Sequence, residues 1–462
     1  MLAVAVSAAA FVMSGMLLQQ VLEYGTIVYE LGGWRPPWGI EYRIDELNAY
    51  VLLIVSALGT VVMFSARKSV ESEIAAERRI FFYVAYLLCL SGLLGIVATA
   101  DLFNVFVFLE MSALSSYILI ALGHDRRGLW ASFQYLMMGT VGATFILIGI
   151  GLIYAKTGTL NMQDISDRLP AVSDTRTVFT GFVFLVVGVC LKLALFPVHL
   201  WLPNAYAYAP SSVTAFLAAT ATKVAVYLLI RLTFSIFGVE FSFSSFPLQQ
   251  IFLVLSLAGI LIASTTAIFQ ENVKRLLAYS SVAQIGYMIL GFSLASVTGL
   301  TASLLHLFNH ALMKGALFLA LGAVMYRIGS VRLDDLAGLG KSMPLTMGAV
   351  VIGGLSLIGV PLTVGFISKW YLITAALERE WWGVAVLVLV GSMLAVVYIW
   401  RIVEAAYFRT RAADAAPVAE APASLLIPTW ILVVANVYFG IDTRLTVGVS
   451  ESIASILFGV AP

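Results

Sequence analysis

Apolar runs long enough to cross a membrane follow one another from one end of the sequence to the other, and no polar block separates them. A helix needs about 20 apolar residues to cross a bilayer. Hydrophobic residues make up 61% of the 462 residues and charged residues only 11%, whereas a soluble domain carries roughly 25% charged residues. Most of the chain therefore has no water-facing surface to cover. We predict an all-α, polytopic membrane protein with one transmembrane domain over 1–462.

Thirteen stretches qualify as spans, and the tail 441–462 is expected as a short fourteenth span or an interfacial segment. The expected fold is thus a bundle of about 13–14 transmembrane helices. The predicted spans are 2–22, 47–66, 80–99, 102–122, 131–155, 178–209, 211–236, 249–270, 275–294, 299–326, 344–376, 383–406 and 424–440.

Two of these spans, 178–209 and 344–376, are too long for one simple crossing and contain helix breakers near the middle. Proline removes a backbone donor and kinks a helix. Such backbone is tolerated at membrane depth only where protein or a water-filled cavity receives it. Interrupted segments in the two halves of a chain indicate an inverted-repeat transporter with its site near the midplane, and a chance match is the alternative. The breakers are Pro197 and Pro203 in the first span, which also holds Lys192, and Gly359, Pro361 and Gly365 in the second, which also holds Lys369.

Lysine and arginine are distributed unevenly between alternate loops, with thirteen on one side and seven on the other. The richer set, which counts Lys274 among its loop residues, should be cytoplasmic. We therefore expect a multi-pass protein of the cell (inner) membrane with its N-terminus in the cytoplasm and its C-terminus outside. The stretch from Ala412 to Ala423 is expected as a flexible cytoplasmic loop, and the apolar start lacks the cationic region of a cleaved signal peptide.

Seven ionisable residues fall inside the predicted spans. An intramembrane charge costs on the order of 2.5–3.5 kcal/mol even on the lenient insertion scale, and it usually marks an ion or proton pathway. Arg231 and Arg401 lie close enough to span ends to snorkel, so a structural role and a pathway role stay equally open for them. The other residues should face a protein or water interior, and the alternative to a pathway is a static buried salt bridge. The seven are Glu110, Lys192, Lys223, Arg231, Lys314, Lys369 and Arg401.

Glu110 and Lys192 form the most informative pair in this set. Burial in a low-dielectric site disfavours the charged form of a lysine, and a nearby carboxylate favours it. A lysine between a movable carboxylate and a dry cavity can therefore load and release a proton as the carboxylate approaches or withdraws. Our hypothesis is that Glu110 and Lys192 work in this way.

His306, His310 and Lys314 follow at intervals of four residues, which places them along one face of a helix. Histidine titrates near neutral pH, so a histidine face beside lysines favours a proton relay. Structural hydrogen bonding is the second interpretation. A metal site is the least favoured, because Lys314 repels a cation and no carboxylate ligand is near in the sequence. His199 at the first break either joins the relay or caps broken backbone.

Several function classes have no support in the sequence. There is no phosphate-binding glycine loop, dinucleotide fingerprint, haem attachment motif, zinc spacing or catalytic triad. Cys89 and Cys190 lie in apolar runs and are expected to be core residues. The net charge of +1 gives no electrostatic case for nucleic acid. We expect no cofactor and no metal, and the energy source must be an ion gradient or a partner subunit.

Six ordered stretches carry a family resemblance that covers nearly the whole chain. The chain resembles the antiporter-like membrane subunits shared by respiratory complex I (the M and N subunits), membrane-bound hydrogenases and multi-subunit Mrp-type cation/proton antiporters (the D-type component). The stretches are Gly33-Trp-Arg-Pro-Pro-Trp-Gly-Ile40, Asp101-Leu-Phe-Asn-Val-Phe-Val-Phe-Leu-Glu110, Leu191-Lys-Leu-Ala-Leu-Phe-Pro-Val-His-Leu-Trp-Leu-Pro203, Thr222-Lys-Val-Ala-Val-Tyr227, Asn272-Val-Lys-Arg-Leu-Leu-Ala-Tyr-Ser-Ser281 and Gly359-Val-Pro-Leu-Thr-Val-Gly-Phe-Ile-Ser-Lys369.

The resemblance implies two inverted five-helix repeats, each with one broken helix. On that pattern, 1–99 holds N-terminal helices, 100–236 the first repeat, 249–406 the second repeat and 407–462 the C-terminal helices. It also implies a role for each buried residue: Glu110 and Lys192 as the coupling pair, Lys223 as the central relay, His306 and His310 as the continuation, and Lys369 as the exit-side residue.

Two departures from the family pattern stand out. Asn204 and Tyr206 follow the first break where the family usually has Asp and His, which leaves the cytoplasmic access loop without two ionisable groups. The family also usually has one more helix before the segment 2–22, and we expect that helix to be absent here.

The expected function is a proton-translocating, antiporter-like subunit of a complex I-like, hydrogenase-like or Mrp-type assembly. The alternatives are a Na⁺/H⁺ antiporter subunit, a scaffold subunit that conducts nothing, and a subunit that serves uptake of a substrate such as bicarbonate by a partner complex. The expected partners are other membrane subunits, H⁺ and, in the antiporter alternative, Na⁺. No catalytic or redox site is readable, so in an oxidoreductase complex this chain would be the ion-translocating part.

Overall fold

The computed structural model describes residues 1–411 and 417–460, and within these the chain folds almost entirely into helices. The all-α prediction is confirmed. The helices are α1 (Leu2–Tyr24), α2 (Glu46–Glu73), α3 (Arg79–Ala98), α4 (Leu102–Ala121), α5 (Arg126–Thr157), α6 (Met162–Arg168), α7 (Arg176–Leu193), α8 (Trp201–Tyr208), α9 (Ser211–Ile230), α10 (Leu248–Ile268), α11 (Val273–Ser293), α12 (Val297–Ile328), α13 (Leu339–Ser342), α14 (Pro344–Ile358), α15 (Val364–Glu378), α16 (Trp382–Phe408), α17 (Ala423–Ile441) and α18 (Arg444–Leu457).

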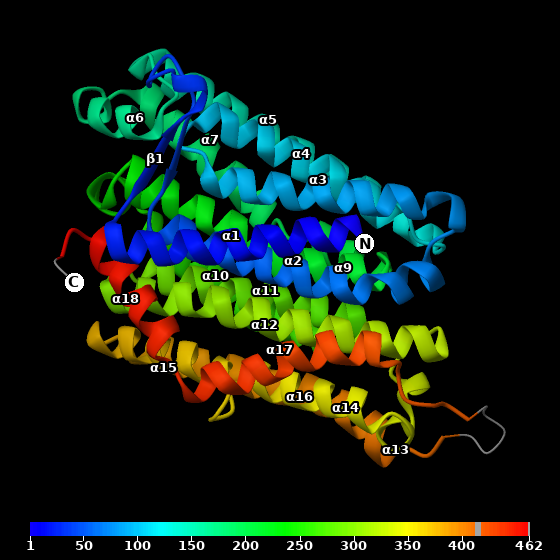
Figure 1. Ribbon diagram of the computed structural model, residues 1–462. Coiled ribbons are helices and arrows are strands. Elements are labelled where there is room, and N and C mark those ends of the chain that lie inside the picture. The colour runs from blue at the N-terminus through cyan, green and yellow to red at the C-terminus, as the bar shows by residue number, and fades with distance from the viewer. Residues whose placement is uncertain (412–416, 461–462) are drawn as a thin grey trace.

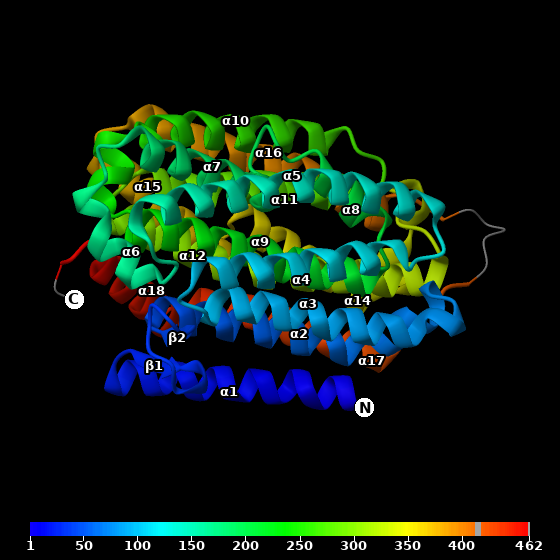
Figure 2. The same cartoon turned by 90° about the horizontal axis from the view of Figure 1, so that it is seen from above.

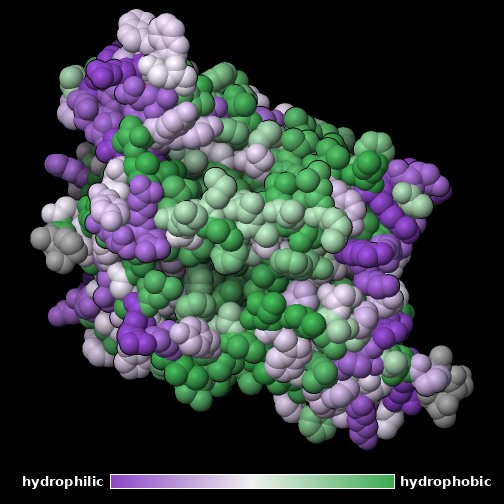
Figure 3. All heavy atoms as spheres, viewed as in Figure 1, coloured by the Kyte–Doolittle hydropathy of each residue, from purple (hydrophilic) through white to green (hydrophobic). Residues whose placement is uncertain are grey.

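Twelve helices of the described residues are long and apolar enough to cross a membrane, and they match twelve of the thirteen predicted spans. The remaining predicted span, 344–376, is divided between α14 and α15, which have 15 residues each. The helices run side by side along one direction, as Figure 1 shows. An apolar band surrounds the middle of the bundle and hydrophilic residues gather at its two ends on the face shown in Figure 3. This pattern is the one that a bilayer selects, so the protein is a polytopic membrane protein.

The two ends of the bundle differ in what they carry. The N-terminus, α13 and the segments that flank 412–416 lie at one end, which we call the N-terminal end (Figure 1). The C-terminus, α6 and the hairpin of β1 (Ile27–Glu30) and β2 (Glu41–Ile44) lie at the other, the C-terminal end. The predicted loop from Ala412 to Ala423 lies partly outside the described residues, and α17 begins at Ala423.

Three helices form the centre of the bundle. α9 and α11 are buried on nearly every side, and α12 packs against α9, α11, α14, α15 and α17. α1 lies at the edge, where only one side contacts α2, as Figure 2 shows. A helix that is apolar all round is stable only when protein or lipid surrounds it. Polar residues on α9, α11 and α12 are therefore enclosed by other helices.

Both predicted helix breaks are present near the middle of the bundle. α7 ends at Leu193, and Ala194 adopts a left-handed conformation with φ 59°. The indole Nε1 of Trp201, at the start of α8, donates to the freed carbonyl of Leu191 at 3.0 Å. In the second break, Gly359 has φ 93°, a conformation that favours glycine. Each break leaves main-chain carbonyl groups without a partner in the helix. Lys192 lies in the last turn of α7 at the first break, and Lys369 on α15 donates to the carbonyls at the end of α14 at the second.

The hairpin of β1 and β2 was not predicted, whereas a short segment in the tail was expected. The β1–β2 hairpin pairs Ile27 with Ile44 and encloses the Gly- and Pro-rich stretch between them. The tail forms α18, which has 14 residues and is too short for a straight crossing. Its buried positions Thr446, Val449, Ser450 and Ile453 recur with helical spacing, which favours the interfacial form of the two expected for this tail.

Candidate functional site

The carboxylate of Glu110 on α4 and the ammonium of Lys192 on α7 form an ion pair of 3.6 Å at the first break. This distance is longer than a hydrogen bond. Neither the paired oxygen of Glu110 nor the Lys192 nitrogen has a hydrogen-bond partner within the described residues. The pair is therefore in contact without being locked in one geometry.

The predicted interior position of Glu110 is only partly correct. Lys192 is 8% exposed, but the Glu110 side chain is 29% exposed. It follows the same helical stripe as Val107 and Leu114, which are exposed on the outer face of α4. The sequence carries no direct sign of this position, because the most exposed residues of α4 are all apolar, as expected for a face in contact with lipid.

A small cavity of about 40 Å³ lies beside Lys192. Its polar lining comes from Ser112, Ser116 and Tyr135, and its far wall is an apolar face of α9. A water molecule needs at least about 10–15 Å³ and several polar partners, so the cavity can hold water next to the Lys192 ammonium. Lys223 lies elsewhere on α9 and does not line this cavity.

Lys223 lies in the centre of the bundle and is completely buried. Its ammonium donates to the carbonyl of Ala218 and is 3.4 Å from the hydroxyl of Thr222. Lys223 is within electrostatic reach of His306, His310 and Lys314 on α12. The structure thus places Lys223 next to the predicted histidine face.

The two histidines of α12 stack with ring centroids 6.2 Å apart. His306 is held on both sides, by Ser368 at 2.8 Å and by the amide oxygen of Gln284 at 3.0 Å. Neither ring nitrogen of His310 has a partner within the part of the chain that the structure describes. His310 is therefore a buried imidazole with no hydrogen bond to the described residues at either ring nitrogen.

Lys314 and Lys369 bind main-chain carbonyls at either end of this face. On α11, Lys314 donates to the carbonyl of Leu277 at 2.8 Å and to the hydroxyl of Ser280 at 2.5 Å. Lys369 donates to Leu357 at 3.1 Å and to Ile358 at 2.7 Å, the carbonyls freed where α14 ends. A cation stabilises the C-terminus of a helix, so Lys369 also stabilises the break. We call Lys223, Lys314, His310, His306 and Lys369 the central row.

Arg231 has a set of fixed partners near the C-terminal end of the bundle. Its guanidinium pairs with both oxygens of Asp45, at 2.7 and 2.8 Å, and donates to Asn48 at 2.6 Å. Burial raises the pKa of the Asp45 carboxyl, but the Arg231 charge outweighs burial and holds that pKa below its ordinary value of 3.8. These contacts favour the structural interpretation of Arg231. Arg401 donates to the carbonyl of Gln270 at 3.2 Å and lies apart from the central row.

His199 and the two departures from the family pattern lie around α8. The His199 ring stacks on Phe196 at 5.4 Å, and its Nδ1 has no partner within the described residues. None of its contacts with those residues joins it to the central row. Asn204 and Tyr206 lie in helix α8 and not in a loop, where they bond to Gln134 at 2.8 Å and to Leu217 at 3.2 Å. The prediction of an access loop at this position is therefore wrong.

Sequence reasoning missed several partners of the site. Gln284 and Ser368 position His306, and Asp45 and Asn48 hold Arg231. The spacing of Asp45 and Asn48 is that of a helix capping box, which could have been recognised. Lys274 was counted as a loop residue, but it is 1% exposed in the first turn of α11.

Comparisons with known proteins show the family to which this chain is similar. Residues 99–395 match the model of the NADH:quinone oxidoreductase/Mrp antiporter transmembrane family. The chain is 43% identical over 425 residues to a NADH-quinone oxidoreductase subunit N of Desulforudis audaxviator, which covers 89% of this chain and 84% of that one. It is 28% identical over 440 residues to the D component of the Na(+)/H(+) antiporter of Bacillus subtilis, covering 95% and 88%. A chain in the structure of the Mrp complex from Dietzia sp. superimposes with a TM-score of 0.91 at 28% identity, covering 99% of this chain and 92% of that one.

The fold and the buried bases define a class, the antiporter-like membrane subunits of complex I-like and Mrp-type assemblies. The family match extends from just before α4 into α16, and it includes both helix breaks and the whole central row. The chain belongs to the NADH:quinone oxidoreductase/Mrp antiporter family. The expected family is thereby confirmed.

Proposed function

We propose that this chain moves protons across the membrane, as one subunit of a larger complex, along the central row. The observation that carries the proposal is that five bases lie buried together without a carboxylate. The ion pairs Glu110–Lys192 and Asp45–Arg231 lie outside the row. Within the described residues, no member of the row takes part in an ion pair.

Five positive charges cannot coexist at this depth. Burial disfavours each charged form, and like charges repel with little screening in a low-dielectric interior. Most of the row must therefore be neutral at any moment, and a neutral amine or imidazole is a proton acceptor. A proton bound to one base of such a row can transfer to a neighbouring neutral base, which is the property that a relay requires.

Buried polar atoms without protein partners mark where water can complete the relay. Both nitrogens of His310 and the hydroxyls of Thr301 and Ser303 on the same helix have no hydrogen-bond partner among the described residues. A buried polar atom is stable only when a partner or a water molecule satisfies it. Water beside α12 would supply the short links over which protons move.

Glu110 and Lys192 are proposed as the coupling pair. The ion pair is loose, lies at a helix break and adjoins a cavity that can hold water. Because the Glu110 side chain is partly exposed on the outer face of α4, a neighbouring subunit can contact it directly. A movement of that subunit would change the distance between Glu110 and Lys192, and with it the proton affinity of the Lys192 amine.

We further propose that 100–236 and 249–406 form the two repeats, each with one half-channel. The N-terminal end of the bundle is proposed to face the cytoplasm and the C-terminal end the outside. The thirteen basic residues of the richer loops support this orientation. The opposite positions of the two termini in Figure 1 are consistent with an odd number of crossings.

The test is proton flux in vesicles that contain the whole complex, with wild type compared with Lys192→Ala. We expect the variant to lose flux while the complex still assembles. Lys156→Ala is the matched control, because Lys156 is an exposed lysine in the last turn of α5. Equal proton flux in wild type and Lys192→Ala would refute the role of the pair.

A second candidate function is the exchange of Na⁺ for protons. The specific support is the similarity to the D component of the Na(+)/H(+) antiporter of Bacillus subtilis over nearly the whole chain. Measurement of ²²Na⁺ uptake driven by a pH gradient in the same vesicles separates the two functions. Absence of both fluxes in the intact complex would favour the scaffold alternative.

A further inference from the structure

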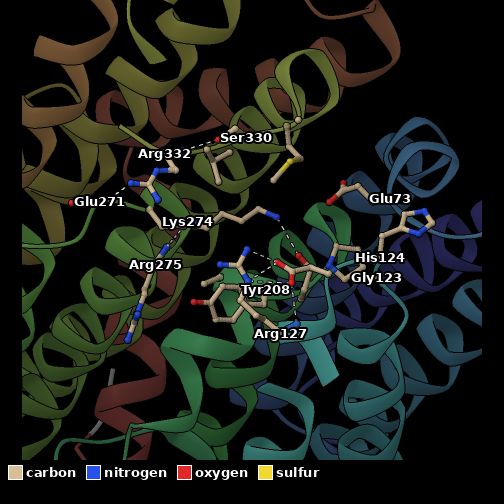
Figure 4. Close-up of a pocket in the computed structure, with 18 of the residues that line it drawn as sticks. Glu73, Gly123, His124, Arg127, Tyr208, Glu271, Lys274, Arg275, Ser330 and Arg332 are labelled. Atoms are coloured by element: carbon tan, nitrogen blue, oxygen red, sulfur yellow. Dashed lines mark hydrogen bonds and ion pairs between the residues drawn. The ribbon is translucent and has the colours of Figure 1, made fainter. Parts of the chain in front are cut away.

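A cavity of about 720 Å³ opens at the N-terminal end of the bundle. Figure 4 shows most of the residues that line it. The loops between α4 and α5, α8 and α9, and α10 and α11 form its walls, together with the segment after α12. We call this cavity the vestibule. Its ionisable lining residues are Glu73, His124, Asp125, Arg127, Glu271, Lys274, Arg275 and Arg332.

Four of these charged residues form two ion pairs at the rim of the vestibule. Arg127 pairs with Asp125 at 2.8 Å and Arg332 pairs with Glu271 at 2.7 Å, and both pairs are well exposed. Ion pairs of this kind contribute little to stability. These two pairs line the opening of the vestibule and involve neither Glu73 nor Lys274.

Glu73 and Lys274 lie deeper in the vestibule. One oxygen of Glu73 accepts hydrogen bonds from the backbone and hydroxyl of Ser211 at 2.9 and 3.1 Å, so this carboxylate is committed to the start of α9. Lys274 is 1% exposed, and its ammonium has one bond, to the carbonyl of Ala209 at 3.2 Å. In Figure 4 its side chain extends across the vestibule toward the side of Glu73 and His124. Lys274 is thus a buried amine at a water-accessible cavity without an ion-pair partner among the described residues.

α11 leads from Lys274 directly to the central row. One turn beyond Lys274, about 5.4 Å along the axis, the carbonyl of Leu277 accepts hydrogen bonds from Lys314 at 2.8 Å and from Ser281 at 3.0 Å. Residues three or four apart lie on one face of a helix. The same helix contributes Gln284, which holds His306. Along this face of α11, Lys274 in the vestibule is followed by the main-chain carbonyl of Leu277, the hydroxyl of Ser281 and the amide of Gln284 beside His306.

We propose that the vestibule is the proton-uptake site of this chain and that Lys274 is the first buried base of the relay. The inference rests on the proposed proton translocation and adds the residue through which protons reach the row. The neutral Lys274 amine takes a proton from water in the vestibule. The resulting ammonium releases it, through water along the Leu277–Ser281 face, to the neutral Lys314 amine, which returns Lys274 to its starting state.

A purely structural role for Lys274 makes a different prediction. Its bond to Ala209 fixes the turn between α8 and α9, and an arginine can make that bond and keep the charge. Arginine cannot release its proton in a protein. Lys274→Arg therefore separates the two roles: it preserves a structural contact and eliminates a proton carrier.

The test measures proton uptake on the vestibule side of vesicles containing the whole complex. We expect Lys274→Met and Lys274→Arg both to reduce the initial rate by about 10²-fold, the lower end of what a positioned proton-transfer group contributes. Lys341→Ala is the matched control, since Lys341 is an exposed lysine of α13 at the same end of the bundle and does not line the vestibule; this variant should keep the wild-type rate.

The outcomes distinguish this inference from the proposed function. A wild-type rate in Lys274→Met, or recovery in Lys274→Arg, would overturn the role of Lys274 while proton flux in wild type still supports translocation. Absence of flux in wild-type complex would overturn the proposed function itself. If Lys274→Met prevents assembly, the Lys274→Arg variant alone decides: wild-type flux contradicts the inference, and loss of flux in the assembled complex supports it.

Discussion

Removal of the Asp45 charge should destabilise the fold without impairing proton flux through the chains that remain folded. Asp45→Asn keeps the size of the side chain but leaves the buried Arg231 guanidinium without a counter-charge. Breaking a buried ion pair costs about 3–5 kcal/mol. The Asp45 side chain is 28% exposed and that of Arg231 11%, so solvent screens part of the loss and we expect the lower end, about 3 kcal/mol.

The local structure allows the charge to be separated from helix capping. The Asp45 side chain also accepts a hydrogen bond from the backbone of Asn48 at 3.0 Å, as the N-cap of α2. Asparagine caps a helix about as well as aspartate, whereas alanine costs about 1 kcal/mol more. Asp45→Ala should therefore be less stable than Asp45→Asn by about that amount.

The assay is the free energy of unfolding in detergent, measured by denaturant titration for each variant. In the double variant Asp45→Asn/Arg231→Met no unpaired charge remains, and stability should return to within about 1 kcal/mol of wild type. If Asp45→Asn is as stable as wild type, the pair does not stabilise the fold and the reasoning is refuted. If the proton flux per folded molecule of Asp45→Asn falls as far as that of Lys192→Ala, Arg231 is part of the proton pathway.

Three further predictions concern Asp45, Glu110 and Gly359. The folded protein holds the pKa of Asp45 below its ordinary value. The stabilisation by the Asp45 charge should therefore be complete above about pH 4 and decline as pH falls through the lower folded pKa. The difference in unfolding free energy between wild type and Asp45→Asn should shrink over the same pH range. Glu110→Gln should abolish proton transport in vesicles while the complex assembles normally, and full activity would remove the Glu110–Lys192 pair from the mechanism. Gly359→Ala should cost about 1–2 kcal/mol, because alanine is strained at positive φ, and should lower flux, since the new Cβ would lie 2.9 Å from Lys369 Cδ; normal stability and flux in this variant would contradict both effects.

Much of the fold could be predicted because the membrane imposes simple rules on a sequence. Apolar length alone indicates the spans, and Pro197 and Gly359 mark the breaks through their backbone chemistry. The residues of the central row were also identifiable, because a base in an apolar run is costly and therefore conspicuous. The β1–β2 hairpin was missed, since it lies between spans where apolar length carries no information.

The contacts that decide each residue's role were less accessible to sequence reasoning. Asp45 and Arg231 are 186 residues apart, and no local pattern joins them. Lys274 looks like a loop charge because it stands at the start of a span, yet the loops around it cover its side chain. Glu110 looks enclosed because it stands in a largely apolar span, and only the packing of α4 against its neighbours shows which face is outermost. Long-range packing thus supplies the information that periodicity lacks.

The most direct test of proton movement along the central row is the flux of an assembled complex carrying Lys223→Arg. Lys223 is completely buried on α9, which packs against α12, the helix that carries both histidines and Lys314. Arginine keeps a positive charge at this position but cannot release a proton. We predict that the complex assembles and that its proton flux falls to the level of protein-free vesicles. Flux at the wild-type rate would show that protons do not pass through Lys223 and would contradict the account.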